Sequence, residues 1–395
     1  MRLPVVAQPT ATTDTAPSVI RQVIVKVHSR CNLSCDYCYV YEHADQSWRR
    51  QPVRMAPQTI QRLASRIGEH AERHGLPRIS VVLHGGEPLL AGLEMIDRTV
   101  ALIRAALPAG TTVDLSVQTN GILLSDSFLQ VFHRHRIRVG VSMDGAQASH
   151  DKHRTYRNGR GSFRGVASAL KILRRPEHRQ LYGGLLCTID VDNDPVETYE
   201  ALLAFAPPRM DFLLPHGNWS TPPPHRVSDP SHTPYADWLI AVFERWYTAT
   251  RRETEIRLFD SIIRLLVGGH STSEAIGLDE PDLVTVETDG SYELSDALKT
   301  TVEGMAATGL DVWRHSLDDV VTLSAVAARR GGIAALAPAC RSCPIVSTCG
   351  GGLHAHRFAA ENGFDNPSVY CPDLFRVIRH IETRVTADLV ALAAR

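Results

Sequence analysis

The feature that most constrains this chain is a run of β-branched residues that leads into three closely spaced cysteines. Residues 23–27 (VIVKV) predict a buried strand. Cys31, Cys35 and Cys38 follow with the spacing C-x3-C-x2-C. They are therefore expected on the loop at the carboxyl end of a strand, where α/β folds gather their functional groups. Three thiolates at this spacing can hold three irons of a four-iron cluster and leave the fourth iron open to a small molecule.

A zinc site or a disulfide pair is the alternative for these cysteines. A zinc site needs a fourth ligand nearby, and His28 and His43 are the local candidates. The preceding strand does not suit a small zinc module. Most of the other cysteines also fall in metal-type spacings, which require free thiolates and hence a reducing compartment. Cys187 stands apart and is expected to be a buried apolar thiol.

Length and composition exclude several function classes. The chain has 395 residues, of which 44% are hydrophobic, enough for a large core and two or three structural units. Its formal net charge is −1 at pH 7, so composition gives no indication of nucleic acid as a partner. No apolar run approaches the ~20 residues of a membrane span, and the amino terminus lacks the apolar core of a signal peptide. We therefore expect a cytoplasmic protein with neither a membrane nor nucleic acid as partner.

Apolar periodicity along the chain alternates between strand and helix. Strands are predicted at residues 23–27, 79–83, 112–117, 138–142, 184–189 and 210–214, with helices near residues 57–74, 93–106, 125–135, 165–173 and 196–206. This alternation predicts an α/β fold with a parallel sheet and right-handed crossovers. Periodicity alone does not separate a partial barrel from a doubly wound sheet.

We expect three regions along the chain. Residues 1–20 are rich in Thr, Ala and Pro and predict a mobile tail. Residues 21–233 contain the alternating strands and helices, followed by a Pro-rich loop at the mouth of the barrel. Residues 234–395 contain further helices and a second group of cysteines. In the mouth loop, His216, Trp219 and His225 have no role that the sequence assigns.

The carboxyl ends of three predicted strands carry polar clusters. HGGEP at residues 84–88 follows the second strand, QTNG at 118–121 ends the third and SMDG at 142–145 ends the fourth. Paired glycines let backbone approach a ligand closely, and a carboxylate can bind an ammonium group. Each cluster alone is also ordinary turn chemistry. Their repetition at successive strand ends favours one shared binding site.

The cysteine spacing, with Tyr37 before the last cysteine and GGEP one βα unit later, resembles the radical S-adenosylmethionine (SAM) superfamily. The resemblance implies a partial (β/α)6 barrel with a SAM-binding [4Fe-4S] cluster at its top. It also implies cleavage of SAM to a 5′-deoxyadenosyl radical, with a small redox protein as electron donor. The residues that it implies at the cofactors are Tyr37, Gly85, Gly86, Glu87, Pro88, Gln118, Ser142 and Arg154.

Residues 144–163 resemble the peptide-modifying branch of this superfamily. Arg154 is there expected to reach the SAM carboxylate or to order the substrate loop. Residues 131–180 contain twelve Lys or Arg against three Asp or Glu. This excess suits an acidic leader peptide, and it equally suits an ordinary solvated surface.

A second cysteine constellation lies near the carboxyl end, with the spacing C-x2-C-x5-C and a fourth cysteine further on. Four thiolates can close a site, and the spacing alone leaves zinc and an iron-sulfur cluster equally open. Residues 340–357 resemble the SPASM extension of radical SAM peptide maturases, which carries auxiliary four-iron clusters. The implied ligands are Cys340, Cys343, Cys349 and Cys371.

This chain departs from the full SPASM pattern. A full extension has further cysteines for a nearer auxiliary cluster, and Ser295 and Leu353 stand at two of those positions here. The resemblance therefore implies one auxiliary [4Fe-4S] cluster. Asp296 follows at the position where sulfatase-maturing relatives carry a catalytic carboxylate, and it can serve as a general base. It can also be a surface acid, because residues 271–303 contain nine acids and one lysine.

Residues 211–224, 289–301 and 349–357 resemble FxsB-type maturases of ribosomally made peptides, so that the resemblance covers nearly the whole chain. It implies cyclophane formation, in which an aromatic ring carbon of a precursor peptide is joined to the β-carbon of a nearby residue. One alternative is a sulfatase-type maturase, which oxidises a Ser or Cys side chain to the aldehyde of formylglycine. The other is a non-catalytic iron-sulfur electron carrier or peptide-binding module.

Overall fold

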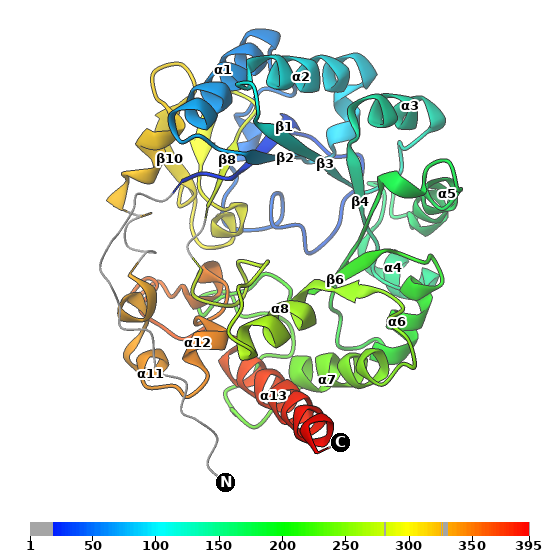
Figure 1. Cartoon of the computed structure of the whole chain (residues 1–395), viewed down its shortest axis with the longest axis vertical. Helices are drawn as coiled ribbons and strands as arrows, with labels where there is room; N and C mark the ends of the chain where they lie inside the picture. The colour runs from blue at the N-terminus through cyan, green and yellow to red at the C-terminus, as the bar shows by residue number, and fades with distance from the viewer. Residues whose placement is uncertain (1–18, 280–281, 325, 327–330, 395) are drawn as a thin grey trace.

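The computed structural model describes residues 19–279, 282–324, 326 and 331–394. Its centre is a ten-stranded sheet with the strand order β10-β9-β8-β1-β2-β3-β4-β5-β6-β7 (Figure 1). Strands β1 to β7 are parallel to their neighbours, and β8 is parallel to β1. Strands β8, β9 and β10 pair antiparallel. The tail predicted for residues 1–20 falls almost wholly outside the described residues.

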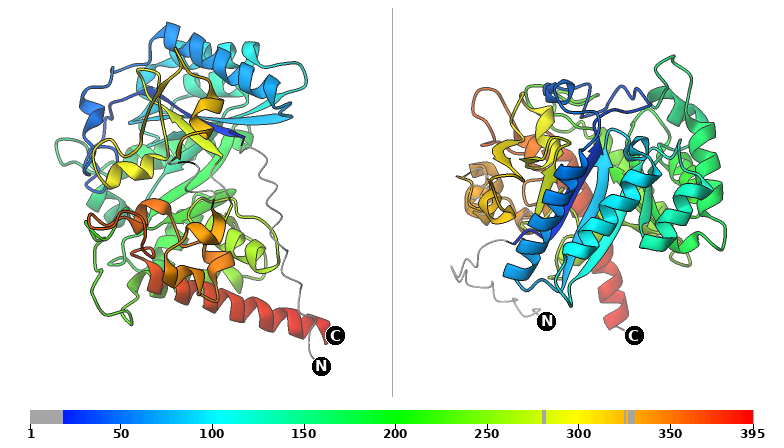
Figure 2. Two further views of the ribbon diagram at one scale, coloured as in Figure 1. Left: turned by 90° about the vertical axis from the view of Figure 1, so that its left-hand side faces the viewer. Right: turned by 90° about the horizontal axis from the view of Figure 1, so that it is seen from above.

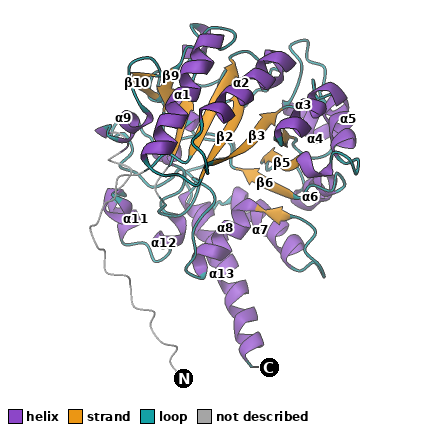
Figure 3. Ribbon diagram, turned by 45° about the horizontal axis from the view of Figure 1, so that its top comes forward, coloured by secondary structure: helices purple, strands orange, loops and turns teal. Residues whose placement is uncertain are grey.

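The six strands and five helices predicted for the first region are confirmed. The strands are β1 (Gln22–His28), β2 (Arg78–Gly85), β3 (Thr112–Thr119), β4 (Arg138–Ser142), β5 (Tyr182–Thr188) and β6 (Arg209–Leu213). The helices are α1 (Pro57–Arg73), α2 (Leu93–Ala106), α3 (Asp126–His135), α5 (Phe163–Leu173) and α6 (Pro195–Leu203), and a short helix α4 (Gln147–His153) was not predicted. The helices cover the outer face of the curved sheet (Figures 1 and 3).

The apolar pattern of each element explains its place in the barrel. In β1, the side chains of Val23, Val25 and Val27 are fully buried, because the strand lies inside a parallel sheet. Helix α1 begins at Pro57, whose missing N–H costs nothing in a first turn. Its apolar stripe, from Ile60 to Ala71, faces the core and leaves the opposite side polar.

The sheet is wider than the sequence predicts. Strand β7 (Glu255–Ile256) extends it beyond β6, and β8 (Leu283–Val286), β9 (Ser291–Glu293) and β10 (Ala307–Asp311) extend it beyond β1. Helix α7 (Pro234–Tyr247) begins where the second region was predicted to begin, but the sheet continues past that point. These strands are two to five residues long, too short for a clear period-2 pattern.

Further elements follow in the C-terminal part of the chain. They are α8 (Arg257–Leu266), η4 (Asp296–Thr300), α9 (Leu317–Val321), α11 (Pro338–Arg341), α12 (Val346–Cys349), η6 (His354–Arg357) and α13 (Cys371–Ala393). Helix α13 packs against α7 and α8, and its last turns extend away from the body (Figure 2). Among the described residues, no helix combines the length and the apolar character needed to cross a bilayer.

Candidate active site

Cys31, Cys35 and Cys38 lie together on the segment between β1 and α1, as predicted. All three are free, half-buried thiols. The backbone N–H of Ser34 donates to the carbonyl of Thr155 (2.7 Å), which ties the cysteine loop to the segment after α4. Burial raises the pKa of Cys31 to about 12 and that of Cys38 to about 11. Thiolates in this place therefore need a bound cation, and three thiols on one loop are a donor set that suits an iron-sulfur cluster.

The paired glycines after β2 press directly against this loop. The N–H of Gly86 donates to the carbonyl of His28 (2.9 Å), and the N–H of Glu87 donates to the carbonyl of Arg30 (3.1 Å). A β-carbon on Gly86 would overlap the Tyr41 hydroxyl and the backbone of Arg30. Only glycine allows this close approach, which brings the GGEP backbone beside the cysteines.

Glu87 is fully buried and joins the ends of β2 and β3. Its carboxylate accepts hydrogen bonds from the Leu89 N–H (2.9 Å), the Thr119 hydroxyl (2.7 Å) and the Asn120 N–H (2.8 Å). Burial raises its pKa, although these donors oppose the shift. The Asn120 side chain in turn donates to Asn32 (2.8 Å) and lies 3.7 Å from the Cys31 sulfur. Glu87 therefore orders the backbone around the cysteines, and its predicted contact with SAM stays a prediction.

Tyr37 and Arg154 both lie at the carboxylate of Asp144, a contact that the sequence did not predict. The Tyr37 hydroxyl donates to the Asp144 carboxylate, and Arg154 donates to the Tyr37 oxygen (2.8 Å). Burial raises the pKa of Asp144, and the Arg154 charge opposes this. The Nε of Arg154 is buried without a partner among the described residues. Arg154 thus holds the cysteine loop through Tyr37 and keeps one donor for an anionic group.

Gln118 and Ser142 lie side by side at the ends of β3 and β4. The Gln118 amide donates to the Ser142 hydroxyl at 3.0 Å. Both side chains are half-buried. The ends of β1 to β4 therefore gather every residue that the sequence predicted at the cofactors, although these roles remain predictions.

The second cysteine set also converges. Cys340, Cys343, Cys349 and Cys371 line one small cavity of about 50 Å³, together with apolar side chains of which Phe375 is the largest. Burial raises the pKa of Cys349 to about 12 and that of Cys371 to about 11, so thiolates here also need a cation. Four thiols around one cavity fit a fully ligated metal or cluster.

The chain folds tightly around this cavity. Gly350, Gly351 and Gly352 all have positive φ, at 60°, 77° and 71°, which side chains rarely adopt. The Arg357 guanidinium donates to the carbonyls of all three glycines, at 2.6, 3.0 and 3.0 Å. At the two positions where the SPASM resemblance predicts further cysteines, the Ser295 hydroxyl donates to Glu274 (3.0 Å), and Leu353 packs in the core.

Asp296 is buried, with 7% of its surface exposed, so the alternative of a surface acid is wrong. Its carboxylate lies 2.6 Å from the ammonium nitrogen of Lys26 on β1. Lys26 also pairs with Glu287 (2.7 Å), and Lys299 pairs with Glu287 (2.9 Å) and Glu293 (2.7 Å). Two ammonium groups and three carboxylates thus form one buried cluster.

The charges of this cluster do not cancel. Burial raises the pKa of Glu293 to about 8. Burial also opposes the charge of Glu287, but the ammonium groups of Lys26 and Lys299 outweigh it and lower the pKa of Glu287. The raised pKa of Glu293 favours its protonated form, which reduces the excess of negative charge in the cluster.

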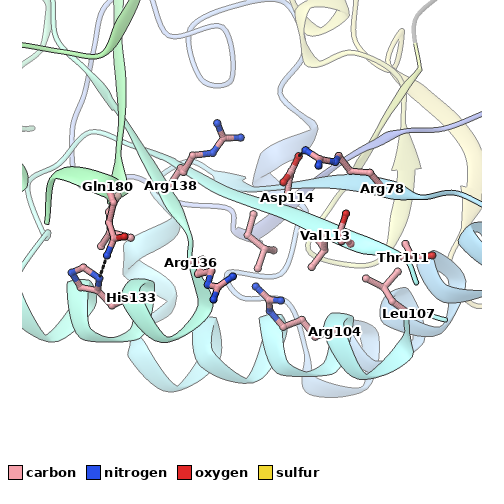
Figure 4. Close-up of a pocket in the computed structure, with 13 residues that line it drawn as sticks. Arg78, Arg104, Leu107, Thr111, Val113, Asp114, His133, Arg136, Arg138 and Gln180 are labelled. Atoms are coloured by element: carbon pink, nitrogen blue, oxygen red, sulfur yellow. Dashed lines mark hydrogen bonds and ion pairs between the residues drawn. The ribbon is translucent and has the colours of Figure 1, made fainter. Parts of the chain in front are cut away.

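A separate cleft lies elsewhere (Figure 4). It measures about 850 Å³ and is lined by Arg78, Arg104, Arg136 and Arg138 among others. Arg78 begins β2 and Arg138 begins β4, so this cleft lies at the amino ends of the strands, opposite the cysteine loop. It is not part of the candidate active site.

Comparisons with known proteins agree with this arrangement. Residues 25–202 match the family model described as the Radical SAM superfamily. The serine-type anaerobic sulfatase-maturating enzyme of Bacteroides thetaiotaomicron is 27% identical over 62% of this chain and 62% of its own length. The serine-type enzyme of Klebsiella aerogenes is 30% identical over 44% of this chain and 40% of its own length. The chain thus spans less than two thirds of these relatives.

Solved structures share the fold. The structure of native anSMEcpe with bound AdoMet superimposes with a TM-score of 0.79 over 93% of this chain and 98% of its own, at 20% identity. Streptococcus suis SuiB bound to precursor peptide SuiA gives a TM-score of 0.55 over 90% of this chain and 76% of its own, at 14% identity. The partial barrel, rather than the doubly wound sheet, is therefore correct, and residues 25–202 of the chain match the radical SAM superfamily.

Proposed function

We propose that this chain modifies a ribosomally made precursor peptide by radical chemistry and joins an aromatic ring carbon to the β-carbon of a nearby residue. The observation that carries the proposal is the buried carboxylate of Asp296. Lys26, which holds it, lies on the strand that leads to Cys31. Helix η4, which begins at Asp296, packs against η6, which follows Cys349. This arrangement supports Asp296 as the general base, because it links Asp296 to the segments that carry the two cysteine sets.

In this proposal each group has a defined task. When bound, SAM and its cluster supply the radical that removes a hydrogen atom from the substrate, and the auxiliary cluster supplies an electron acceptor. Cys31, Cys35 and Cys38 hold the first cluster, and the strand ends around Gly86 hold SAM. Bond formation to the ring leaves one electron and one proton to be removed, and Asp296 accepts the proton.

Names of similar proteins support a peptide substrate. One anSMEcpe structure contains AdoMet and the Cp18Cys peptide, and one SuiB structure contains precursor peptide SuiA. The sulfatase-maturating relatives favour a second candidate, the oxidation of a Ser or Cys side chain to an aldehyde. The replacement of two SPASM cysteines by Ser295 and Leu353 favours the crosslink, because the sulfatase-type pattern has ligands for a nearer cluster at these positions.

The deciding experiment is mass spectrometry of modified peptides. The enzyme is co-expressed with the peptide encoded beside its gene and, separately, with a sulfatase-derived peptide that carries the target Ser or Cys. Crosslinking and aldehyde formation from Ser each remove two hydrogens, but a cyclophane resists backbone fragmentation between the linked residues and does not react with hydrazines. A hydrazine-reactive product would show that the enzyme forms an aldehyde rather than a crosslink. Absence of 5′-deoxyadenosine from the reduced protein with SAM would instead favour a non-catalytic carrier.

A further inference from the structure

Three histidines carry a buried ring nitrogen that has no partner among the described residues. These atoms are Nδ1 of His84, Nδ1 of His216 and Nε2 of His356. By contrast, buried His70 and His150 use both of their ring nitrogens in hydrogen bonds. A buried polar atom without a partner is costly, and native proteins satisfy nearly all such atoms. His216 and His356 lie in contact, so one ligand could satisfy both of their open nitrogens.

His216 and His356 lie against one another, with ring centroids 5.7 Å apart. Tyr39 packs on His216 and Tyr370 packs on His356, each with centroids 5.0 Å apart. The Tyr370 hydroxyl donates to the carbonyl of Pro215 (2.6 Å), directly before His216. Packing therefore fixes the orientations of both rings. Nδ1 of His216 and Nε2 of His356 have no hydrogen-bond partner among the described residues.

The pair lies beside Asp296. Helix η6, which contains His356, packs against η4, which begins at Asp296. Asn218, two residues after His216, donates to the carbonyl of Thr300 at the end of η4 (3.0 Å). The negative charge of Asp296 also acts on the His216 ring. The mouth loop and the C-terminal region thus present both imidazoles next to the proposed base.

Both rings are neutral near pH 7. Burial lowers the pKa of His216 to about 4 and also lowers the pKa of His356 well below its usual value. A neutral imidazole has one donor and one acceptor nitrogen, so the pair suits an uncharged group that both donates and accepts. An anion would meet the Asp296 carboxylate and no cationic ring. Two imidazoles are also fewer ligands than the four of a structural zinc site.

We infer that His216 and His356 form a binding subsite for an amide of the peptide substrate, and that this subsite positions the reacting residue beside Asp296. The amide belongs to the peptide backbone next to that residue or to an Asn or Gln side chain. The inference rests on the proposed peptide substrate, but it holds for either the crosslinking or the aldehyde reaction.

The test uses the anaerobically reconstituted enzyme and the fluorescein-labelled form of whichever of the two peptides the wild type modifies. His216→Phe and His356→Phe keep an aromatic ring but remove the nitrogens. Each should weaken peptide binding about 3- to 10-fold in fluorescence anisotropy, the effect of one lost hydrogen bond. KM should rise by a similar factor with little change in kcat, and SAM cleavage without peptide should stay at the wild-type rate.

Two further variants keep the result interpretable. His356→Gln retains a donor and an acceptor, so it should recover most of the affinity lost in His356→Phe. His232→Phe changes an exposed residue of the same mouth loop and should bind peptide as the wild type does. If His216→Phe and His356→Phe both bind peptide with wild-type affinity and unfold at the wild-type temperature, the two histidines do not form a peptide subsite, even where peptide modification is intact. Failure of the wild type to modify either peptide would instead reject the proposed function on which the inference rests.

Discussion

The ammonium nitrogen of Lys26 lies 2.6 Å from a carboxylate oxygen of Asp296, which joins β1 to the short helix η4 across 270 positions of the chain. Burial opposes the charge of Lys26, but the surrounding carboxylates outweigh this and raise its pKa well above the usual value. Lys26 therefore stays charged and fixes the proposed base at the end of the strand that leads to the cysteine loop. This ion pair makes Asp296 part of the barrel rather than of a peripheral loop.

Replacement of Lys26 by Met should destabilise the fold strongly. The change leaves Lys299 as the one ammonium group among three buried carboxylates, and breaking a buried ion pair costs about 3–5 kcal/mol. The free energy of unfolding by urea measures this cost. Lys152→Met is a matched control, because Lys152 is half-exposed and its pairs with Asp190 and Asp192 should contribute at most about 1 kcal/mol. Equal effects of the two variants would contradict the importance of the buried cluster.

Asp296→Asn should separate radical formation from product formation. The variant keeps the size of the side chain but removes the proton acceptor, and loss of a general base typically lowers the rate about 10²–10⁴-fold. We expect 5′-deoxyadenosine to form near the wild-type rate while peptide product falls by at least ~10²-fold. Liquid chromatography of both products from one reaction gives the ratio. Full product formation by the variant would leave Asp296 with a structural role in the ion-pair cluster.

The cysteine sets predict the iron content of the protein. A three-thiolate and a four-thiolate set should hold about eight irons per chain after anaerobic reconstitution. Replacing Cys31, Cys35 and Cys38 together by Ala should leave about half of this iron. Cys187→Ala is the matched control, because Cys187 is buried on β5 and belongs to neither set, and its iron content should equal that of the wild type. Twelve irons, or zinc in the C-terminal site, would contradict the assignment.

Much of the barrel could be predicted because its strands are rich in β-branched residues and its functional groups stand directly after them. The C-terminal cysteine site could also be predicted, because the cysteines from Cys340 to Cys349 lie close together in the sequence. The edge strands β8 to β10 were missed because they are short and lie in an acidic stretch that predicts exposure. Strand pairing with β1 overrides that local preference.

The buried charge cluster could be predicted only in part. A lysine inside the run VIVKV is itself a signal, because a charge on a strand buried on both faces must be paired. Its partner Glu287 lies 261 positions away, and one sequence does not identify a contact at that separation. The partnership of Tyr37 with Asp144 escaped prediction for the same reason, at a separation of 107 positions.

Glu87→Ala should weaken SAM binding mainly by disordering the backbone near the cysteines. The change removes the acceptor of three hydrogen bonds and leaves the donors of Leu89, Thr119 and Asn120 unpaired. Each unpaired buried donor costs about 1–3 kcal/mol, so unfolding should become easier as SAM affinity falls. Equilibrium dialysis with labelled SAM and a urea titration measure the two effects. Glu94→Ala, at an exposed position in the first turn of α2, should change neither, and wild-type SAM affinity in Glu87→Ala would move the SAM site elsewhere.

Stability should fall as the pH drops below about 6.5, because several histidines are buried in the neutral form. His150 is the clearest case: burial and the nearby Arg154 charge lower its pKa to about 3 from 6.5. Between these values the unfolded chain takes up a proton that the folded chain does not, so acid favours unfolding. Each such histidine contributes a slope approaching about 1.4 kcal/mol per pH unit.

Urea unfolding of the wild type at pH 7.5, 6.5 and 5.5 measures this dependence. His84, His216 and His356 have pKa values lowered by burial in the same way, so the total slope should exceed that of one proton. His150→Gln retains a donor and an acceptor for Asp144 and Ser162 but does not titrate, so it should reduce the slope by about one proton. His270→Gln alters an exposed side chain and should keep the wild-type slope. A His150→Gln slope equal to that of the wild type would show that His150 is protonated in the folded protein, which would contradict its hydrogen bond from the Asp144 N–H.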